Sequence, residues 1–194
     1  MKERRIQLLL NIAILLCLGA AIILRFVDLD NIPGLNGDDA WLATQIRNLI
    51  AGRAYTIETP THRWVAPTYI FAQGLFQLLP WTNIIVLKMP IALASVAGVL
   101  AIPLLFQKIL SRTELAIATL IVACMPIHVA YARSLGELSQ VGLAMAVVMA
   151  LVYRGRILWA LMALALASTI HPTCMLGVPI VICGCAAGLE PAKA

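Results

Sequence analysis

The chain has 194 residues, of which 62% are hydrophobic and 12% are charged, and its formal net charge is +5 at pH 7. Soluble domains carry about 25% charged residues, so this composition excludes an ordinary soluble domain and indicates a polytopic membrane protein. The basic residues are scattered through short loops instead of gathering on one face, which argues against a nucleic-acid partner.

The first predicted element is a membrane helix that follows the basic N-terminal "MKERR". The apolar run from Ile6 to Leu24 is longer than the apolar core of a signal peptide, so we predict a retained signal-anchor helix. In chain order, the apolar segments of the sequence are 6–27, 84–106, 114–131, 137–153, 157–170 and 173–189. A span takes about 20 residues, so the first two segments are long enough and the later ones are shorter.

We therefore predict an all-α, polytopic transmembrane helix bundle of about six segments, forming a single module over residues 1–194. The last two segments share the stretch 157–189, which is broken only by His171-Pro172. That stretch is too short for two full spans and a turn, so tilted, truncated and re-entrant helices all stay open for it.

The basic residues predict the orientation of the bundle. Those on one predicted side are Lys2, Arg4, Arg5, Lys108, Arg112, Arg154, Arg156 and Lys193. The short loop between the third and fourth segments, on the other side, holds only Arg133. The positive-inside rule therefore predicts a cytoplasmic N-terminus in the cell (inner) membrane, with the long loop 28–83 on the extracytoplasmic side.

The long outer loop is predicted to contain two short helices. Residues 39–51 repeat apolar side chains with the spacing of one helical face, and Gly52 suits the position after a helix end. Pro67 suits the first turn of a second helix that is apolar nearly all round. Both helices are expected to lie at the membrane surface, as amphipathic interfacial helices do.

Asp38 and Asp39 stand side by side at the start of the first loop helix. An aspartate there can cap the helix and complement its dipole, which needs only one of the two. A carboxylate at the mouth of a membrane bundle can also accept a proton from an attacking hydroxyl or hold a divalent cation. Asp38 and Asp39 are therefore candidate catalytic residues, and the capping explanation stays open beside that one.

Four further ionisable residues near the outer helix ends are candidate substrate-binding residues: Lys88, Arg133, Glu137 and His171. Lys88 can extend its ammonium to the interface or pair with a lipid phosphate. Arg133 and Glu137, four apart, can form an ordinary ion pair, but ionisable groups in membrane helices are by default functional candidates, and the arginine fork suits phosphate. His171 can be a solvated loop residue or a hydrogen-bond donor to phosphate. The metal requirement stays open, because no set of three ligands is visible.

The order of four motifs resembles a known family. An acidic pair opens an amphipathic helix in "GDDAWLATQIRNLIAGRAY", and an interfacial helix follows in "APTYIFAQGLFQLL". "LKMPIALASVAGVLAIPLLFQKIL" and "ACMPIHVAYARSLGELS" come next. Over roughly residues 1–185 this order resembles the N-terminal part of the GT-C glycosyltransferases, which include protein O-mannosyltransferases and lipid A aminoarabinose transferases.

The resemblance implies roles for individual residues. Asp38 matches the first acid of the family's pair, a general base or metal-associated carboxylate, and Asp39 falls where many members have Glu. Lys88 falls where the family usually has Arg, Arg133 matches a basic residue that contacts the lipid phosphate, and His171 falls where members carry Lys or His. The family's "HPP" before the second loop helix is "RWVAP" here.

The function implied is transfer of a sugar from a polyprenyl-phosphate donor to a glycan, lipid or protein acceptor on the extracytoplasmic side. No cofactor is implied beyond a divalent metal at Asp38. Family members continue for several more spans, so a second chain supplying those helices is an expected partner, besides membrane lipid. The alternatives are a non-catalytic polyprenyl-lipid-binding subunit, a small transporter or flippase, and an inactive truncated paralogue. The enzyme is favoured because the ionisable residues gather at the outer interface instead of the bilayer midplane.

Overall fold

The computed structural model describes residues 2–32, 34, 37–62, 64–65, 67–78 and 84–187. The elements in chain order are α1 (Lys2–Phe26), α2 (Gly37–Ile50), α3 (Pro67–Gln77), α4 (Ile84–Phe106), α5 (Arg112–Cys124), α6 (Pro126–Ala132), α7 (Leu138–Tyr153), α8 (Ile157–Ser168), the 3-10 helix η1 (Pro172–Leu176) and α9 (Gly177–Ala186). The predicted all-α class is confirmed for these residues, whose β pairing is limited to an isolated bridge between Glu58 and Trp64.

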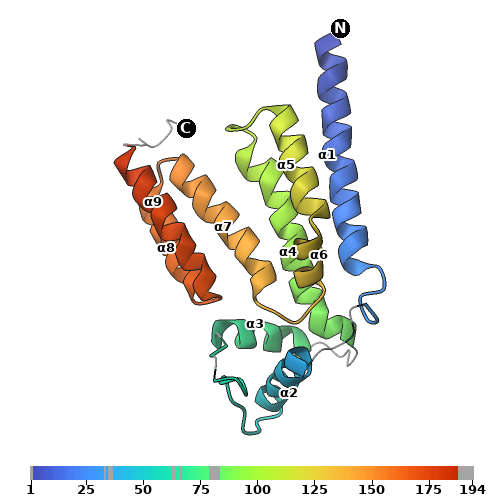
Figure 1. The fold of residues 1–194 in the computed structure, drawn as a ribbon, viewed down its shortest axis with the longest axis vertical. Helices are drawn as coiled ribbons and strands as arrows, with labels where there is room; N and C mark the ends of the chain where they lie inside the picture. Colours follow the sequence, from blue (N-terminus) through green and yellow to red (C-terminus); the bar gives the residue numbers. More distant parts are fainter. Residues whose placement is uncertain are drawn as a thin grey trace.

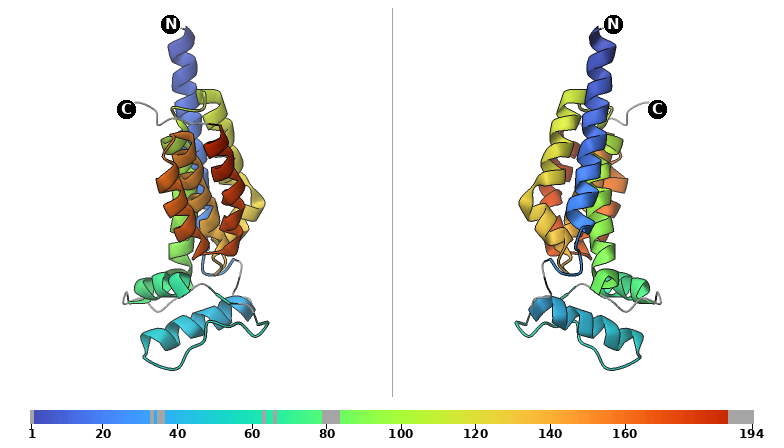
Figure 2. Two further views of the ribbon diagram at one scale, coloured as in Figure 1. Left: turned by 90° about the vertical axis from the view of Figure 1, so that its left-hand side faces the viewer. Right: turned by 90° about the vertical axis from the view of Figure 1, so that its right-hand side faces the viewer.

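The helices form a bundle with a two-helix unit at one end. Helices α1, α4, α5 with α6, α7, α8 and α9 run side by side and alternate in direction (Figure 1). The start of α1 and the end of α9 lie at the same end of this bundle. Helices α2 and α3 lie crosswise beyond the opposite end (Figure 2). Lys193 and positions 188–189 of the last predicted segment lie outside the described residues.

The chain is a membrane protein, but six full spans are not confirmed. Among the described helices, α1 and α4 are long and apolar enough to cross a membrane, and the bent pair α5 and α6 gives a third candidate if it counts as one span. Helices α7, α8 and the η1–α9 segment are apolar but shorter. The outside of the bundle is apolar too: Leu8, Leu16, Leu158, Leu166 and Ile182 are each at least 60% exposed. Such a surface suits lipid and not water.

The third predicted segment, 114–131, is not one continuous helix. Helix α5 ends at Cys124, α6 begins at Pro126, and the two axes are bent by 54°. Proline has no backbone N–H, and its ring clashes with the carbonyl four residues earlier, here that of Val122. The guanidinium of Arg25 instead donates to the carbonyl oxygens of Ala123 at 2.9 Å and Val122 at 3.2 Å. A side chain from α1 therefore satisfies carbonyls that the proline leaves free.

The two helices predicted in the outer loop are present as α2 and α3. Leu42 and Ile46 are buried on one face of α2, as their spacing predicts. Gly52 follows the helix end with a φ of +63°, and Arg53 N–H donates to Asn48 O at 2.8 Å, which closes the helix in the left-handed conformation that favours glycine.

An apolar cluster attaches the two-helix unit to the bundle. Its buried members are Leu42, Ala43, Ile46, Val65, Tyr69, Ile70, Leu87, Ile91 and Leu135. They come from α2, from Val65 just before α3, from α3, from the first turns of α4 and from the loop between α6 and α7. This cluster holds the start of α2 against the α6–α7 loop, and the candidate site lies there.

Candidate functional site at the end of the bundle

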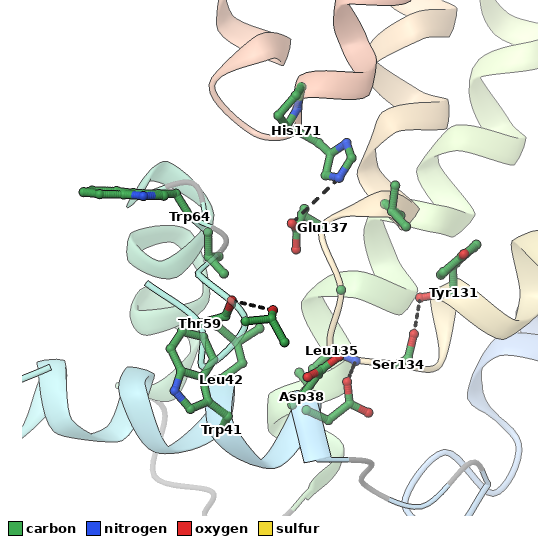
Figure 3. A pocket seen from close by; sticks show the side chains of 16 residues that line it. Asp38, Trp41, Leu42, Thr59, Trp64, Tyr131, Ser134, Leu135, Glu137 and His171 are labelled. Carbon is green, nitrogen blue, oxygen red and sulfur yellow. Dashed lines mark hydrogen bonds and ion pairs between the residues drawn. The ribbon is translucent and has the colours of Figure 1, made fainter. Parts of the chain in front are cut away.

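A cleft of about 660 Å³ lies between the two-helix unit and the end of the bundle. Its walls come from the start of α2, the residues Thr59, Thr61, Trp64 and Val65, the α6–α7 loop and the start of η1 (Figure 3). The lining residues are Asp38, Asp39, Trp41, Leu42, Thr59, Thr61, Trp64, Val65, Tyr131, Ser134, Leu135, Gly136, Glu137, Leu138, His171 and Pro172. Four of the six predicted site residues therefore meet here, namely Asp38, Asp39, Glu137 and His171.

The two aspartates of the pair have different environments. Asp38 lies in the first turn of α2 with an exposed side chain that lines the cleft. Asp39 is 2% exposed, and its Oδ1 accepts a hydrogen bond from Leu135 N–H at 2.9 Å. That bond ties the start of α2 to the α6–α7 loop. Asp39 is therefore suited to positioning the start of α2 against the α6–α7 loop. Asp38 is the carboxylate that a bound molecule can reach.

His171 and Glu137 point toward each other across the cleft (Figure 3). His171 Nδ1 accepts a hydrogen bond from Thr173 N–H at 3.1 Å, which caps η1. A ring nitrogen that accepts a hydrogen bond carries no proton, so neutral His171 carries its proton on Nε2. That Nε2 lies 3.9 Å from Glu137 Oε1. The cap thus presents an N–H donor to the cleft beside a carboxylate.

Arg133 lies behind the cleft and binds the turn that follows α1. Its Nε donates to Ile32 O at 2.8 Å, its Nη1 to Leu24 O at 2.8 Å and its Nη2 to Asp28 O at 2.9 Å. Asp28 has a φ of 56°, so the chain turns sharply there. Among the described residues, no ion pair within 4 Å joins Arg133 to Glu137. The predicted spacing of four therefore does not produce that pair.

Lys88 is also directed at the same turn. It is fully buried near the start of α4, and its Nζ donates to Leu29 O at 3.1 Å. Lys88 and Arg133 are therefore both placed to hold the segment between α1 and α2. The described lining of the cleft contains neither of them, and no other lysine or arginine of the described part of the chain lines it.

Aromatic rings and hydroxyls that the sequence analysis did not select complete the cleft. Trp41 and Trp64 stand at its wall, and Thr59 and Thr61 share a hydrogen bond of 3.0 Å between their hydroxyls. Trp64 is exposed, so its flat face is available to a ligand. Tryptophan in a polar loop next to threonines is a weak signal in sequence, because exposed aromatics are common at membrane interfaces.

Tyr69 of α3 lies beneath the cleft and is almost fully buried. Burial raises the pKa of Tyr69 well above its ordinary value, and the nearby Glu137 and Asp39 carboxylates raise it further. Its hydroxyl accepts a hydrogen bond from Gln73 Nε2 at 3.4 Å. The phenol is therefore neutral at physiological pH. Tyr69 supports the cleft by packing beneath it and does not act as a proton acceptor.

The predicted metal at Asp38 stays a prediction. Among the residues that the structure describes, no group of three His, Cys, Asp or Glu side chains could hold a metal ion. Magnesium is usually bound by one or two carboxylates together with water and substrate phosphate. Asp38 has the chemistry for one such ligand, and the remaining ligands would have to come from the substrate and from water.

Comparison with known proteins does not identify the chain. No protein-family model, curated protein or solved structure matches it. The function is therefore argued from the cleft itself and from the motif order described above.

Proposed function

We propose that the chain is a membrane glycosyltransferase that moves a sugar from a polyprenyl-phosphate donor to an acceptor hydroxyl or amine in the cleft. One observation carries this proposal. The cleft places an exposed carboxylate, Asp38, and an imidazole N–H, that of His171, on opposing walls at the end of an apolar bundle. A base and a hydrogen-bond donor on two sides of one cleft are what a displacement reaction requires.

The proposed reaction is a single displacement at the anomeric carbon. The acceptor oxygen or nitrogen forms a bond to that carbon while the bond from the carbon to the phosphate oxygen breaks. The electron pair of the broken bond stays on the polyprenyl phosphate, and the acceptor proton passes to Asp38. A single displacement inverts the configuration at the anomeric carbon, so inversion is part of the proposal.

The walls of the cleft support a sugar as the bound group. Trp41 and Trp64 offer apolar ring faces, and the Thr59 and Thr61 hydroxyls and the Glu137 carboxylate offer hydrogen-bonding partners. A ligand site of this kind combines apolar faces with a few polar groups that orient the ligand. The location supports a lipid-linked donor, because a headgroup carried on a long chain reaches the end of an apolar bundle directly.

The contacts of Lys88 and Arg133 change the roles proposed for them. Both donate to backbone carbonyls in the turn after α1. We propose that they position that turn and that His171 donates to the departing phosphate. A divalent cation at Asp38 would add charge stabilisation, as metals do beside phosphoryl oxygens.

The test measures the transfer of labelled sugar away from polyprenyl-phosphate donors. Membranes containing the full chain are incubated with polyprenyl phosphates that carry mannose, glucose or an amino sugar, and loss of label from the lipid is measured. Asp38→Asn is expected to abolish transfer without changing the amount of protein in the membrane. Glu58→Gln is the matched control, because Glu58 lies in the same loop, is exposed and is absent from the cleft lining. Unchanged transfer in Asp38→Asn would refute the catalytic role.

The same experiment separates an enzyme from a binding module. A non-catalytic binding module is the second candidate, because among the described residues the cleft lining holds no lysine or arginine to stabilise a departing phosphate. If wild-type protein retains the labelled donor through washing but never releases sugar, with or without added Mg²⁺ or Mn²⁺, the chain is a lipid-sugar-binding protein. Release of sugar with an inverted product would support the enzyme.

A further inference from the structure

A second, smaller cavity lies inside the bundle, apart from the cleft. It has a volume of about 90 Å³ and is lined by residues of α4, α5, α6 and α7. Its polar lining consists of Ser95, His128 and Ser139, and Val122 borders it at the end of α5. A cavity with polar walls holds water or an ion, whereas apolar cavities of this kind stay dry.

Arg25 lies beside two of the residues that line this cavity, although its own atoms are not part of the lining, and it carries a positive charge there. Its side chain is 0% exposed, and its four hydrogen bonds go to the Ser95 hydroxyl and to the carbonyl oxygens of Ala21, Ala123 and Val122, all of them uncharged. Two of these partners, Ser95 and Val122, are cavity-lining residues. In the part of the chain that the structure describes, no carboxylate lies within ion-pair distance of Arg25.

Several N–H and O–H groups around the cavity have no acceptor among the described residues. A guanidinium carries five N–H groups, so one N–H on Nη2 of Arg25 has no partner among the described residues. Ser95 Oγ accepts from Arg25 Nε at 2.7 Å, which leaves the serine proton to point elsewhere, and no described group accepts it. His128 adds a ring N–H in either neutral tautomer. Donors from three helices thus meet around one buried charge.

We propose that this cavity binds a small monovalent anion of the size of chloride. An unpaired buried cation is costly because it loses its hydration, and an anion close to it offsets part of that loss. Water would satisfy the donors but would leave the charge uncompensated. A single negative charge matches the single charge of Arg25. The bound anion would hold α1 against the break between α5 and α6. This site is independent of the proposed glycosyl transfer.

Three substitutions and halide probes test the site. Gly142→Ala would place a Cβ 3.1 Å from His128 Cε1 and shrink the cavity. Ser95→Ala removes one donor. Ser168→Ala is the control, because Ser168 lies on α8 and bonds to Leu164 O. The full chain in detergent is melted in sodium chloride, sodium bromide and sodium gluconate at equal ionic strength.

The expected result is a saturable rise of the melting midpoint with chloride or bromide but not with gluconate. Ser168→Ala should keep this response, whereas Gly142→Ala and Ser95→Ala should lose most of it. Crystals grown in bromide should show an anomalous peak beside Arg25. A response shared by gluconate or kept in both cavity variants would overturn the proposal, as would a bromide crystal with water alone in the cavity.

Discussion

Arg133→Met gives the sharpest test of the turn after α1. The substitution removes three hydrogen bonds from a charged donor, at 2.8, 2.8 and 2.9 Å. At about 1.5 kcal/mol for each such bond, the loss is about 4.5 kcal/mol. The flexible replacement recovers about 2 kcal/mol of side-chain entropy that the ordered arginine had lost. The net destabilisation is therefore about 2.5 kcal/mol, which lowers the melting temperature of a chain this size by about 5–10 °C.

The assay compares thermal unfolding of the purified variants with their retention of labelled polyprenyl-phosphate sugar. Arg133→Lys keeps the charge but cannot reach three carbonyls with the geometry of a guanidinium, so it should melt nearly as early as Arg133→Met. Arg53→Met, at an exposed arginine just after α2, should melt like the wild type. If both Arg133 variants melt within about 1 °C of wild type but no longer retain the donor, Arg133 binds phosphate directly and the reasoning fails.

Three further outcomes are expected. Asp39→Ala should destabilise the protein by about 1–3 kcal/mol in thermal unfolding, because Leu135 N–H loses its buried acceptor, whereas Asp38→Ala should change stability little. Stability should fall as the pH rises above about 10, because Tyr69 ionises in the unfolded chain while its raised pKa keeps it neutral in the folded protein. In thermal melts at alkaline pH, Tyr69→Phe should make this decline of stability with pH shallower. An unchanged slope in Tyr69→Phe would contradict the prediction. Phe71→Glu on the outward face of α3 should weaken quenching of loop tryptophans by brominated lipid, and equal quenching would place that face away from lipid.

The local pattern of the loop helices predicted most of their structure. Leu42 and Ile46 are buried on the face that their spacing indicates, and Gly52 ends α2 in the left-handed conformation. The role of Asp39 could not be predicted in this way, because its partner, Leu135 N–H, is 96 positions away. Periodicity identifies which side of a helix is buried, but it does not identify what the buried side contacts.

The same limit applies to two features at the end of the bundle, the break in the segment 114–131 and the contacts of Arg133. The segment 114–131 is apolar throughout, so hydropathy predicted one helix even though Pro126 was visible in the sequence. Arg133 was a candidate for contacting a lipid phosphate because a cation near lipid suggests one, and that role stays a prediction. In the fold, the nearest acceptors are the carbonyls of the turn after α1, more than 100 positions earlier. Free carbonyls at a helix end in an apolar environment need donors as much as a phosphate does.

Helix α3 is apolar on its outward side as well as on its buried side. Tyr69, Ile70 and Gln73 are buried in a helix that packs against α2 and α4, whereas Phe71 and Leu75 point outward and are exposed. An outward apolar face is stable when the surrounding solvent is lipid. The helix lies across the end of the bundle and beside α2, whose first turn carries Asp38. Under the proposed function, a donor whose chain lies in the bilayer would bring its phosphate and sugar to the level of α3, and Asp38 and His171 would meet the sugar there without any large movement of the bundle.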